Sequence, residues 1–162
     1  MKSKLMVMLL FILLLGGSLA IAEPQEGGPT LRLARNAGVP DKYDLIMSDG
    51  DEAVVSGTFS KSQVETFRNI LLEARKFASN EEEVGNQEPK TTRIASESEP
   101  AFIVDVTKLD DQSQIFITLT TDVGQLTIEA GNVQRRSKRE QGVFISLLTR
   151  MQALLPAPVP AK

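Results

Sequence analysis

Apolar and polar residues alternate over three consecutive segments between residues 102 and 130, which is the pattern of strands with one buried face. Two short turns, at Asp110-Asp111 and over residues 121–124, would bring the apolar residues of these segments into facing pairs. The pairs are Val106–Ile115, Val104–Ile117, Phe102–Leu119, Leu119–Leu126 and Ile117–Ile128. Both registers place these residues on the same face, so the pattern predicts an antiparallel three-stranded meander.

The opposite face of the meander would carry polar side chains together with two large apolar ones. The polar members are Asp105, Thr107, Thr118, Thr120, Thr127 and Glu129. Ile103 and Phe116 are the apolar members, and the register makes them diagonal neighbours. Apolar side chains framed by threonines such as Thr118 are typical of a docking surface, unless a short segment such as residues 31–35 covers them.

The first half of the chain predicts a hairpin followed by a helix. Residues 43–48 and 52–59 are apolar and β-branched runs that flank Asp49-Gly50, a strong hairpin signal. A three-residue loop over 49–51 keeps the large apolar residues of both runs, from Tyr43 to Phe59, on one face, whereas a two-residue loop would mix them with polar residues. Ser60 and Gln63 have the spacing of a capping box, and an apolar stripe with helical period extends from there to about Ala78.

A second helix is expected after the basic run at residues 134–140, where Ser137 and Glu140 repeat the capping-box spacing. Its apolar stripe includes Phe144, Leu147, Leu148, Met151, Leu154 and Leu155. Pro156 would end the helix, and residues 157–162 would form a proline-rich tail.

Two segments show neither structural period. Residues 23–40 read as a flexible leader, within which residues 31–35 could form a short helix or an edge strand. Residues 79–100 read as a long mobile loop, acidic because of Glu81, Glu82 and Glu83.

These elements, in the order ββα-βββα, predict one α+β domain over residues 41–156. The economical arrangement is a two-layer sandwich, with an antiparallel sheet of about five strands and two helices covering one face.

Residues 1–22 have the layout of a cleavable signal peptide. Lys2 and Lys4 precede an apolar run, and a small-x-small site ends at Ala22, after which the cut is expected. A retained membrane anchor is the alternative, because the apolar stretch approaches the length of a bilayer span. Cleavage would remove two lysines and change the net charge from −3 to −5.

The chain has no cysteine, so no lipid can be attached to one and no disulfide can form. Small secreted animal domains often depend on disulfides, and their absence points to bacterial export, to the periplasm or the medium. After cleavage we expect no stable insertion in a membrane.

Composition excludes much enzyme chemistry. Without histidine or cysteine the chain lacks the commonest general base, the thiol nucleophile and the usual zinc, copper and haem ligands, and we expect no cofactor or metal. Asp105 and Glu129 are predicted on the same sheet face, and this pair of carboxylates could serve a glycosidase-like hydrolase. We expect a protein that is not an enzyme.

The basic residues Arg135, Arg136, Lys138 and Arg139 form the second candidate site. Cations at the start of a helix oppose its dipole, so we expect them to be solvated, to pair with residues 81–83, or to bind an external anion. Nucleic acid is not expected, because the mature chain is acidic and exported.

The sequence therefore predicts an exported, non-catalytic binding or assembly module of the bacterial cell envelope. Its partner would be a protein or an anionic envelope polymer, bound through the sheet face, the basic cluster or both. The alternatives are the carboxylate hydrolase and a domain that binds a small apolar ligand between the sheet and the helices.

Overall fold

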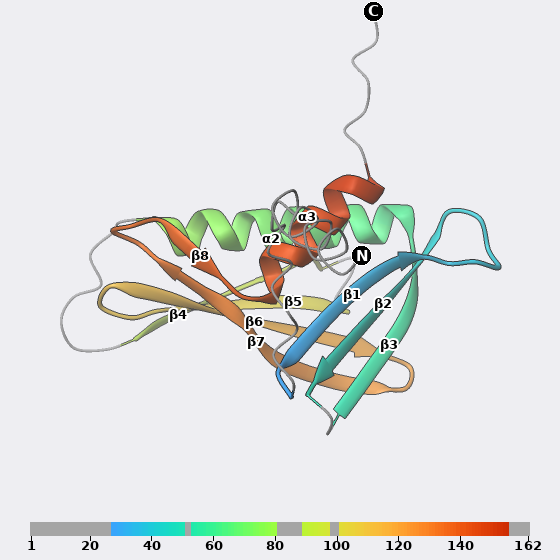
Figure 1. Ribbon diagram of the computed structural model, residues 1–162, viewed down its shortest axis with the longest axis horizontal. Helices are drawn as coiled ribbons and strands as arrows, with labels where there is room; N and C mark the ends of the chain where they lie inside the picture. The colour runs from blue at the N-terminus through green and yellow to red at the C-terminus, as the bar shows by residue number, and fades with distance from the viewer. Residues whose placement is uncertain (1–26, 51–52, 81–88, 98–100, 156–162) are drawn as a thin grey trace, which may run out of the picture.

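The computed structural model describes residues 27–50, 53–80, 89–97 and 101–155, which form an α+β fold with two antiparallel sheets and two helices (Figure 1). The three-stranded sheet has the order β1-β2-β3, and the five-stranded sheet has the order β4-β5-β6-β7-β8. The strands are β1 Pro29–Arg35, β2 Lys42–Asp49, β3 Ala53–Ser60, β4 Lys90–Ala95, β5 Phe102–Lys108, β6 Gln112–Thr121, β7 Gly124–Gln134 and β8 Arg139–Gln141. The helices are α2 Lys61–Ser79 and α3 Val143–Leu154.

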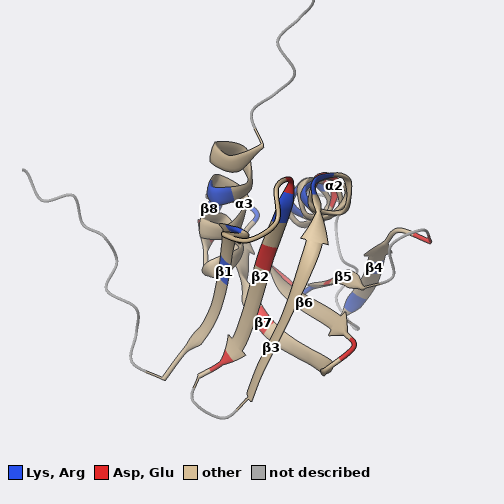
Figure 2. Cartoon of the chain, turned by 90° about the vertical axis from the view of Figure 1, so that its right-hand side faces the viewer, with Lys and Arg blue, Asp and Glu red and all other residues tan. Residues whose placement is uncertain are grey.

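Both helices lie on the same side of the five-stranded sheet, and the three-stranded sheet crosses one end of it (Figure 1). In the view turned by 90°, β1, β2 and β3 stand in front and α2 is seen along its axis (Figure 2). The predicted α+β class is confirmed, as are a five-stranded antiparallel sheet and two helices on one of its faces. The arrangement is not a simple two-layer sandwich, because the strands are divided between two sheets.

One hydrophobic core joins the two sheets through α2. The ring of Phe67 on α2 meets Phe59 of β3 edge to face at 5.0 Å and stacks on Phe102 of β5 at 4.7 Å. Phe67 and Phe102 are completely buried. Residues from both sheets and from α2 thus contribute to a single core.

The predicted meander is confirmed in both registers. All five predicted facing pairs, from Phe102–Leu119 to Ile117–Ile128, occur in β5, β6 and β7. The first hairpin is also present, and its predicted apolar face is correct. Tyr43 lies opposite Phe59 and Asp49 opposite Ala53, so the pairing is displaced by two residues from that of the predicted loop over 49–51, which would place Tyr43 opposite Gly57; an even displacement leaves the faces unchanged. Residues 51 and 52 of its turn lie outside the described residues.

The start of α2 is where the sequence placed it. The Ser60 hydroxyl accepts a hydrogen bond from the Gln63 backbone at 3.3 Å, and the Gln63 side chain accepts one from the Ser60 backbone at 2.8 Å. This reciprocal capping box satisfies two backbone donors at the helix end.

The prediction of a flexible leader over residues 23–40 is wrong for residues 29–35, which form β1. Leu31 and Leu33 are buried and lie opposite Met47 and Leu45 of β2. The alternation is only two leucines long, so the sequence could not distinguish this strand from a short helix. Residues 23–26 lie outside the described residues.

The prediction of a structureless loop over residues 79–100 is wrong for residues 90–95, which form β4. This edge strand pairs with β5 through its backbone, and Ile94 is its only buried residue. With one buried apolar side chain, the alternation in this segment is only a weak strand signal. Residues 81–88 and 98–100 lie outside the described residues.

The second helix begins later along the chain than the sequence predicted. β7 continues to Gln134, the chain reverses, and β8 pairs with β7 before α3 starts at Val143 with Gly142 as its N-cap. Ser137 therefore caps no helix. The predicted stripe is otherwise correct, because Phe144, Leu147, Leu148 and Met151 are buried. No helix in the described part of the chain is long and apolar enough to span a bilayer.

Candidate functional site

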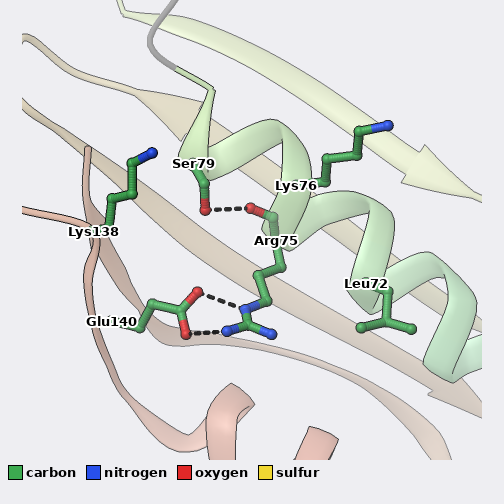
Figure 3. A pocket seen from close by; sticks show the side chains of 6 residues that line it. All are labelled: Leu72, Arg75, Lys76, Ser79, Lys138 and Glu140. Carbon is green, nitrogen blue, oxygen red and sulfur yellow. Dashed lines mark hydrogen bonds and ion pairs between the residues drawn. The ribbon is translucent and has the colours of Figure 1, made fainter. Parts of the chain in front are cut away.

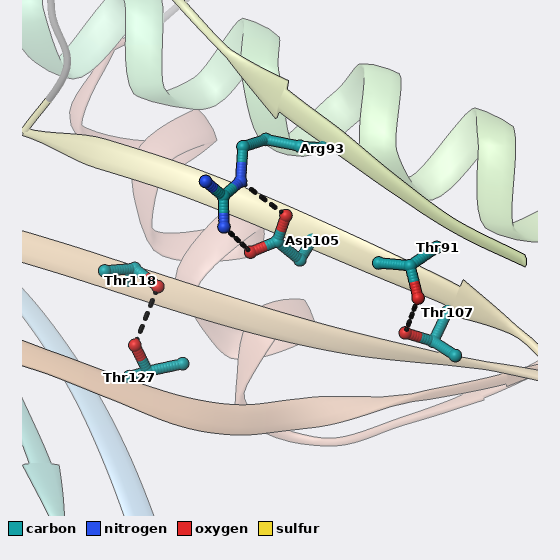
Figure 4. Close-up of polar contacts among 6 residues, drawn as sticks. All are labelled: Thr91, Arg93, Asp105, Thr107, Thr118 and Thr127. Atoms are coloured by element: carbon teal, nitrogen blue, oxygen red, sulfur yellow. Dashed lines mark hydrogen bonds and ion pairs between the residues drawn. The ribbon is translucent and has the colours of Figure 1, made fainter.

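The first candidate site is the face of the five-stranded sheet opposite the helices, which we call the open face. It consists of the outward side chains of β4, β5, β6 and β7. They include Thr91, Arg93, Ile103, Asp105, Thr107, Phe116, Thr118, Thr127 and Glu129. Among the described elements, no helix or strand packs over this face (Figures 1 and 4). Residues 31–35, considered as a possible cover, instead belong to β1, where Leu31 and Leu33 pack into the core.

Three cross-strand polar pairs occupy the open face (Figure 4). The Arg93 guanidinium donates to both Asp105 oxygens, at 2.9 and 3.0 Å. The hydroxyls of Thr91 and Thr107 are 2.9 Å apart, and those of Thr118 and Thr127 are 2.8 Å apart. The hydrogen bond to Asp105 is the main cause of the raised pKa of Arg93, so the guanidinium is charged at any physiological pH.

Ile103 and Phe116 lie between these pairs and are half-buried. Ile103 is opposite Thr118, and Phe116 is opposite Asp105, so the predicted diagonal arrangement is confirmed. The structure therefore brings together three of the predicted site residues, because Thr118 is also buried among them at 6% exposure.

The two carboxylates considered for hydrolysis share one cross-strand row. Asp105 and Glu129 lie on either side of Phe116. A general acid must hold a proton that it can give away, whereas both oxygens of Asp105 accept hydrogen bonds from a permanently charged guanidinium. This geometry does not favour acid catalysis by Asp105.

The second candidate, the basic run, is not a cluster at the start of a helix. Arg135 is 5% exposed and donates hydrogen bonds to Gln112 O at 2.8 Å and Ser113 Oγ at 3.1 Å. Its other terminal nitrogen donates to the carbonyls of Leu109 and Asp110. Arg135 thus holds the β5–β6 turn and does not face solvent.

The remaining three predicted basic residues, Arg136, Lys138 and Arg139, are exposed in and beside the β7–β8 turn. The helix-dipole argument for anion binding fails, because no helix begins there. The predicted pairing with residues 81–83 lies outside the described residues.

The β7–β8 turn forms a surface hollow of about 400 Å³ with the end of α2 (Figure 3). Arg75 of α2 donates to both oxygens of Glu140, at 2.5 and 2.7 Å, and this contact is the main cause of the raised pKa of Arg75. Lys76 and Lys138 stand at opposite sides of the hollow in Figure 3. Of the predicted cluster, only Lys138 lines this hollow.

Sequence reasoning missed Thr91, Arg93 and Arg75 as members of these sites. Thr91 and Arg93 belong to the unrecognised strand β4, although their alternation with Thr92 and Ile94 is a weak strand signal. Arg75 pairs with a residue 65 positions away, which no local pattern reveals.

Comparisons with known proteins do not assign this chain to a family. No protein-family model matches the chain, and no curated protein matches it. A solved structure from work on SsgB mutations that correlate with longitudinal cell division during sporulation of Streptomyces coelicolor is similar over 83% of this chain and 94% of that chain. The sequence identity is 15% and the TM-score is 0.31, and a score this low carries no argument about fold or function.

Proposed function

We propose that this protein is an exported, non-catalytic binding or assembly module of the bacterial cell envelope, and that the open face is where it binds a partner protein. Export is proposed from the signal-like pattern of residues 1–22. The observation that carries the binding proposal is the open face itself, on which two half-buried apolar side chains lie among polar groups that are already hydrogen-bonded to one another.

This pairing matters for the energetics of binding. A polar group that loses water without gaining a partner costs free energy, and this cost opposes association. On the open face, the Thr91–Thr107, Thr118–Thr127 and Arg93–Asp105 hydrogen bonds would persist beneath a partner. The face can therefore be covered at a smaller desolvation cost than a surface of unpaired polar residues.

Composition also favours a protein partner. Protein interfaces commonly have aromatic and aliphatic side chains at the centre and polar residues at the rim. Phe116 and Ile103 provide such a centre, and threonines surround them. An anionic polymer would instead require several free cations. On β4 to β7 of this face, Arg93 is the only cation among the described residues, and it is already paired with Asp105; Arg139 lies on the same side of the sheet, but on the opposite edge strand β8.

The proposal is tested by affinity capture from an envelope extract of the producing cell, using the double variant Ile103→Thr/Phe116→Thr. Threonine keeps strand propensity while removing the apolar contacts. We expect roughly a tenfold loss of the captured partner, as for interface hot spots. The matched control is Ile46→Thr/Val54→Thr, which introduces threonine at two apolar residues that are 39% and 64% exposed on the other sheet.

Equal loss in both double variants, or no loss in the first, would contradict a specific role for the open face. The hydrolase alternative is tested separately with Asp105→Asn and Glu129→Gln. We expect these substitutions to leave partner capture intact; loss of a hydrolytic activity on envelope glycans in both would overturn the non-catalytic proposal.

A further inference from the structure

Charges on the open face follow a regular order across the sheet. One cross-strand row contains Arg93 on β4, Asp105 on β5, Phe116 on β6 and Glu129 on β7. Adjacent strands are about 4.8 Å apart, so Arg93 and Glu129 are separated by roughly 14 Å and do not pair within one chain. The row is thus basic at one end and acidic at the other.

Both ends of the row have unused capacity for an ion pair. The Arg93 side chain is 67% exposed and contacts Asp105 through Nε and Nη2, so Nη1 donates no hydrogen bond to the described residues. Glu129 is exposed and makes no ion pair within the described ranges. An external surface that matches this row needs an acid opposite Arg93 and a base opposite Glu129.

A second copy of the same chain meets this requirement. A two-fold axis that lies in the interface plane, parallel to the strands and midway between β5 and β6, reverses the strand order of the facing sheet. It sets Arg93 of each copy against Glu129 of the other, and Ile103 against Thr118. An axis across the strands instead sets each strand against itself and matches no opposite charges.

We propose that the open face is the interface of a symmetric homodimer, in which two Arg93–Glu129 contacts flank a centre formed by Ile103, Phe116 and Thr118. This inference rests on the proposed function, that the open face is a docking surface, and names the partner as a second copy. The interface is isologous, as is usual in homodimers. In this arrangement Asp105 is opposite Phe116 of the other copy, and its charge is balanced by its own Arg93.

The area of the open face sets the strength of this association. Four strands of each copy, β4 to β7, overlap about this axis. With strands spaced about 4.8 Å apart and three rows of outward residues, they bury on the order of 800 Å² in total. That area is below the range of stable interfaces, so the dimer should be weak, be in rapid exchange with the monomer and have a Kd of about 10–100 µM.

The test is sedimentation equilibrium of the mature chain over a concentration series, with charge reversals at the two ends of the row. Glu129→Arg places like charges at both contacts of its homodimer. The double variant Arg93→Glu/Asp105→Arg does the same, while it preserves a cross-strand ion pair in reversed orientation. We expect each variant to self-associate at least about tenfold more weakly than the wild type.

Mixing the two variants should restore the dimer, because both contacts of the mixed dimer again join opposite charges. The matched control is Glu73→Arg, the same charge reversal at an exposed residue of α2 on the other side of the sheet, and it should leave association unchanged. Thermal melts of every variant check that each one folds.

The outcomes separate this inference from the proposed function. A wild type that remains monomeric up to about 500 µM overturns the homodimer, while the capture experiment with Ile103→Thr/Phe116→Thr still decides whether the face binds another protein. A wild-type dimer that both reversals leave unaffected, or that mixing fails to restore, also overturns it, because the copies would then meet elsewhere.

Discussion

Arg135 shows how one side chain can stabilise a turn from a neighbouring strand. Its guanidinium reaches across from the end of β7 to the carbonyls of Leu109, Asp110 and Gln112 in the β5–β6 turn. Planar guanidinium has several donors fixed in direction, which suits a set of converging carbonyls. Arg135 therefore belongs to the interior of the protein, although it lies within a run of charged residues.

Replacement of Arg135 by alanine should lower the free energy of unfolding by roughly 2–4 kcal/mol, because several buried carbonyls would lose their donor. Arg135→Lys should recover little of this loss, since one ammonium group cannot reach all the acceptors. Urea denaturation monitored by circular dichroism measures the change. Arg136→Ala, at the exposed neighbour, is the control and should change stability by less than about 0.5 kcal/mol; similar losses at both positions would show that Arg135 has no special role.

Asp44 links the β1–β2 loop to β3. It accepts hydrogen bonds from Asn36 Nδ2 at 2.9 and 3.1 Å and from Thr58 Oγ1 at 2.7 Å. These bonds, chiefly those from Asn36, lower the pKa of Asp44 below its ordinary value. The folded state therefore favours the ionised carboxylate.

A lowered pKa makes a contribution to stability that is fully present above the ordinary aspartate value of about 3.9 and is lost as the pH falls through the folded value. Asp44→Asn should therefore lower Tm at pH 7, and its difference from the wild type should shrink as the pH falls below about 4. Scanning calorimetry across pH 2–7 measures this trend. Asp49→Asn, at the exposed end of the same strand, is the control, and parallel profiles for the two variants would refute the role of Asp44.

The candidate residues were only partly predictable from the sequence. Ile103, Phe116 and Thr118 were found together because alternation within adjacent strands determines which residues share a face. Arg135 was wrongly predicted to be a surface cation, because the groups that it hydrogen-bonds are 22–26 residues upstream. Arg93 was not predicted as a site residue, because it lies on an edge strand with one buried residue. Partners distant in sequence leave no local pattern.

At the scale of elements, the junction of β7, β8 and α3 depends on two glycines packed against each other. Gly131 and Gly142 have φ angles of 142° and 118°, which side chains rarely adopt. A Cβ on Gly142 would also meet the backbone of Ala130 and Gly131. The pair ends the ladder and lets α3 begin without a side-chain cap.

Gly142→Ala should destabilise the protein by roughly 2 kcal/mol or more, because it combines an unfavourable φ with backbone overlap. Thermal unfolding provides the measurement. Gly38→Ala is the matched control, since the nearest atom to its added Cβ is Asn36 Oδ1 at 3.6 Å, an ordinary contact. A control loss as large as that of Gly142→Ala would mean that glycine content in general, and not this junction, determines the effect.

Elements with strong local signals were predicted well, and those defined by pairing alone were not. The α2 capping box and the meander depend on residues close in sequence, and both were correct. β4 and β8 are edge strands that contribute little to the core, and β8 has only three residues. Such strands exist because a neighbouring strand offers unpaired backbone groups, which the edge strand's own residues do not encode.

At the scale of the whole molecule, the sequence could not show that the strands form two sheets. The hairpin β2–β3 and the meander both have one apolar face, and these faces fit a single sheet as well as two. In the structure the hairpin and the meander belong to different sheets. β1 extends the hairpin to three strands, and β4 and β8 extend the meander to five. α2 then fills the space between the sheets with Phe67, which contacts an aromatic ring from each.

The contacts of Arg135 also bear on the order in which the protein folds. They join groups at most 26 residues apart, within a meander whose strands follow one another directly along the chain. Contacts between β3 and β6, by contrast, close a loop that runs from residue 60 to residue 112 and includes α2, β4 and β5. Short loops close at a lower entropic cost and sooner than long ones. The meander is therefore the region expected to reach its native pairing first, and the three-stranded sheet docks onto a surface that already exists.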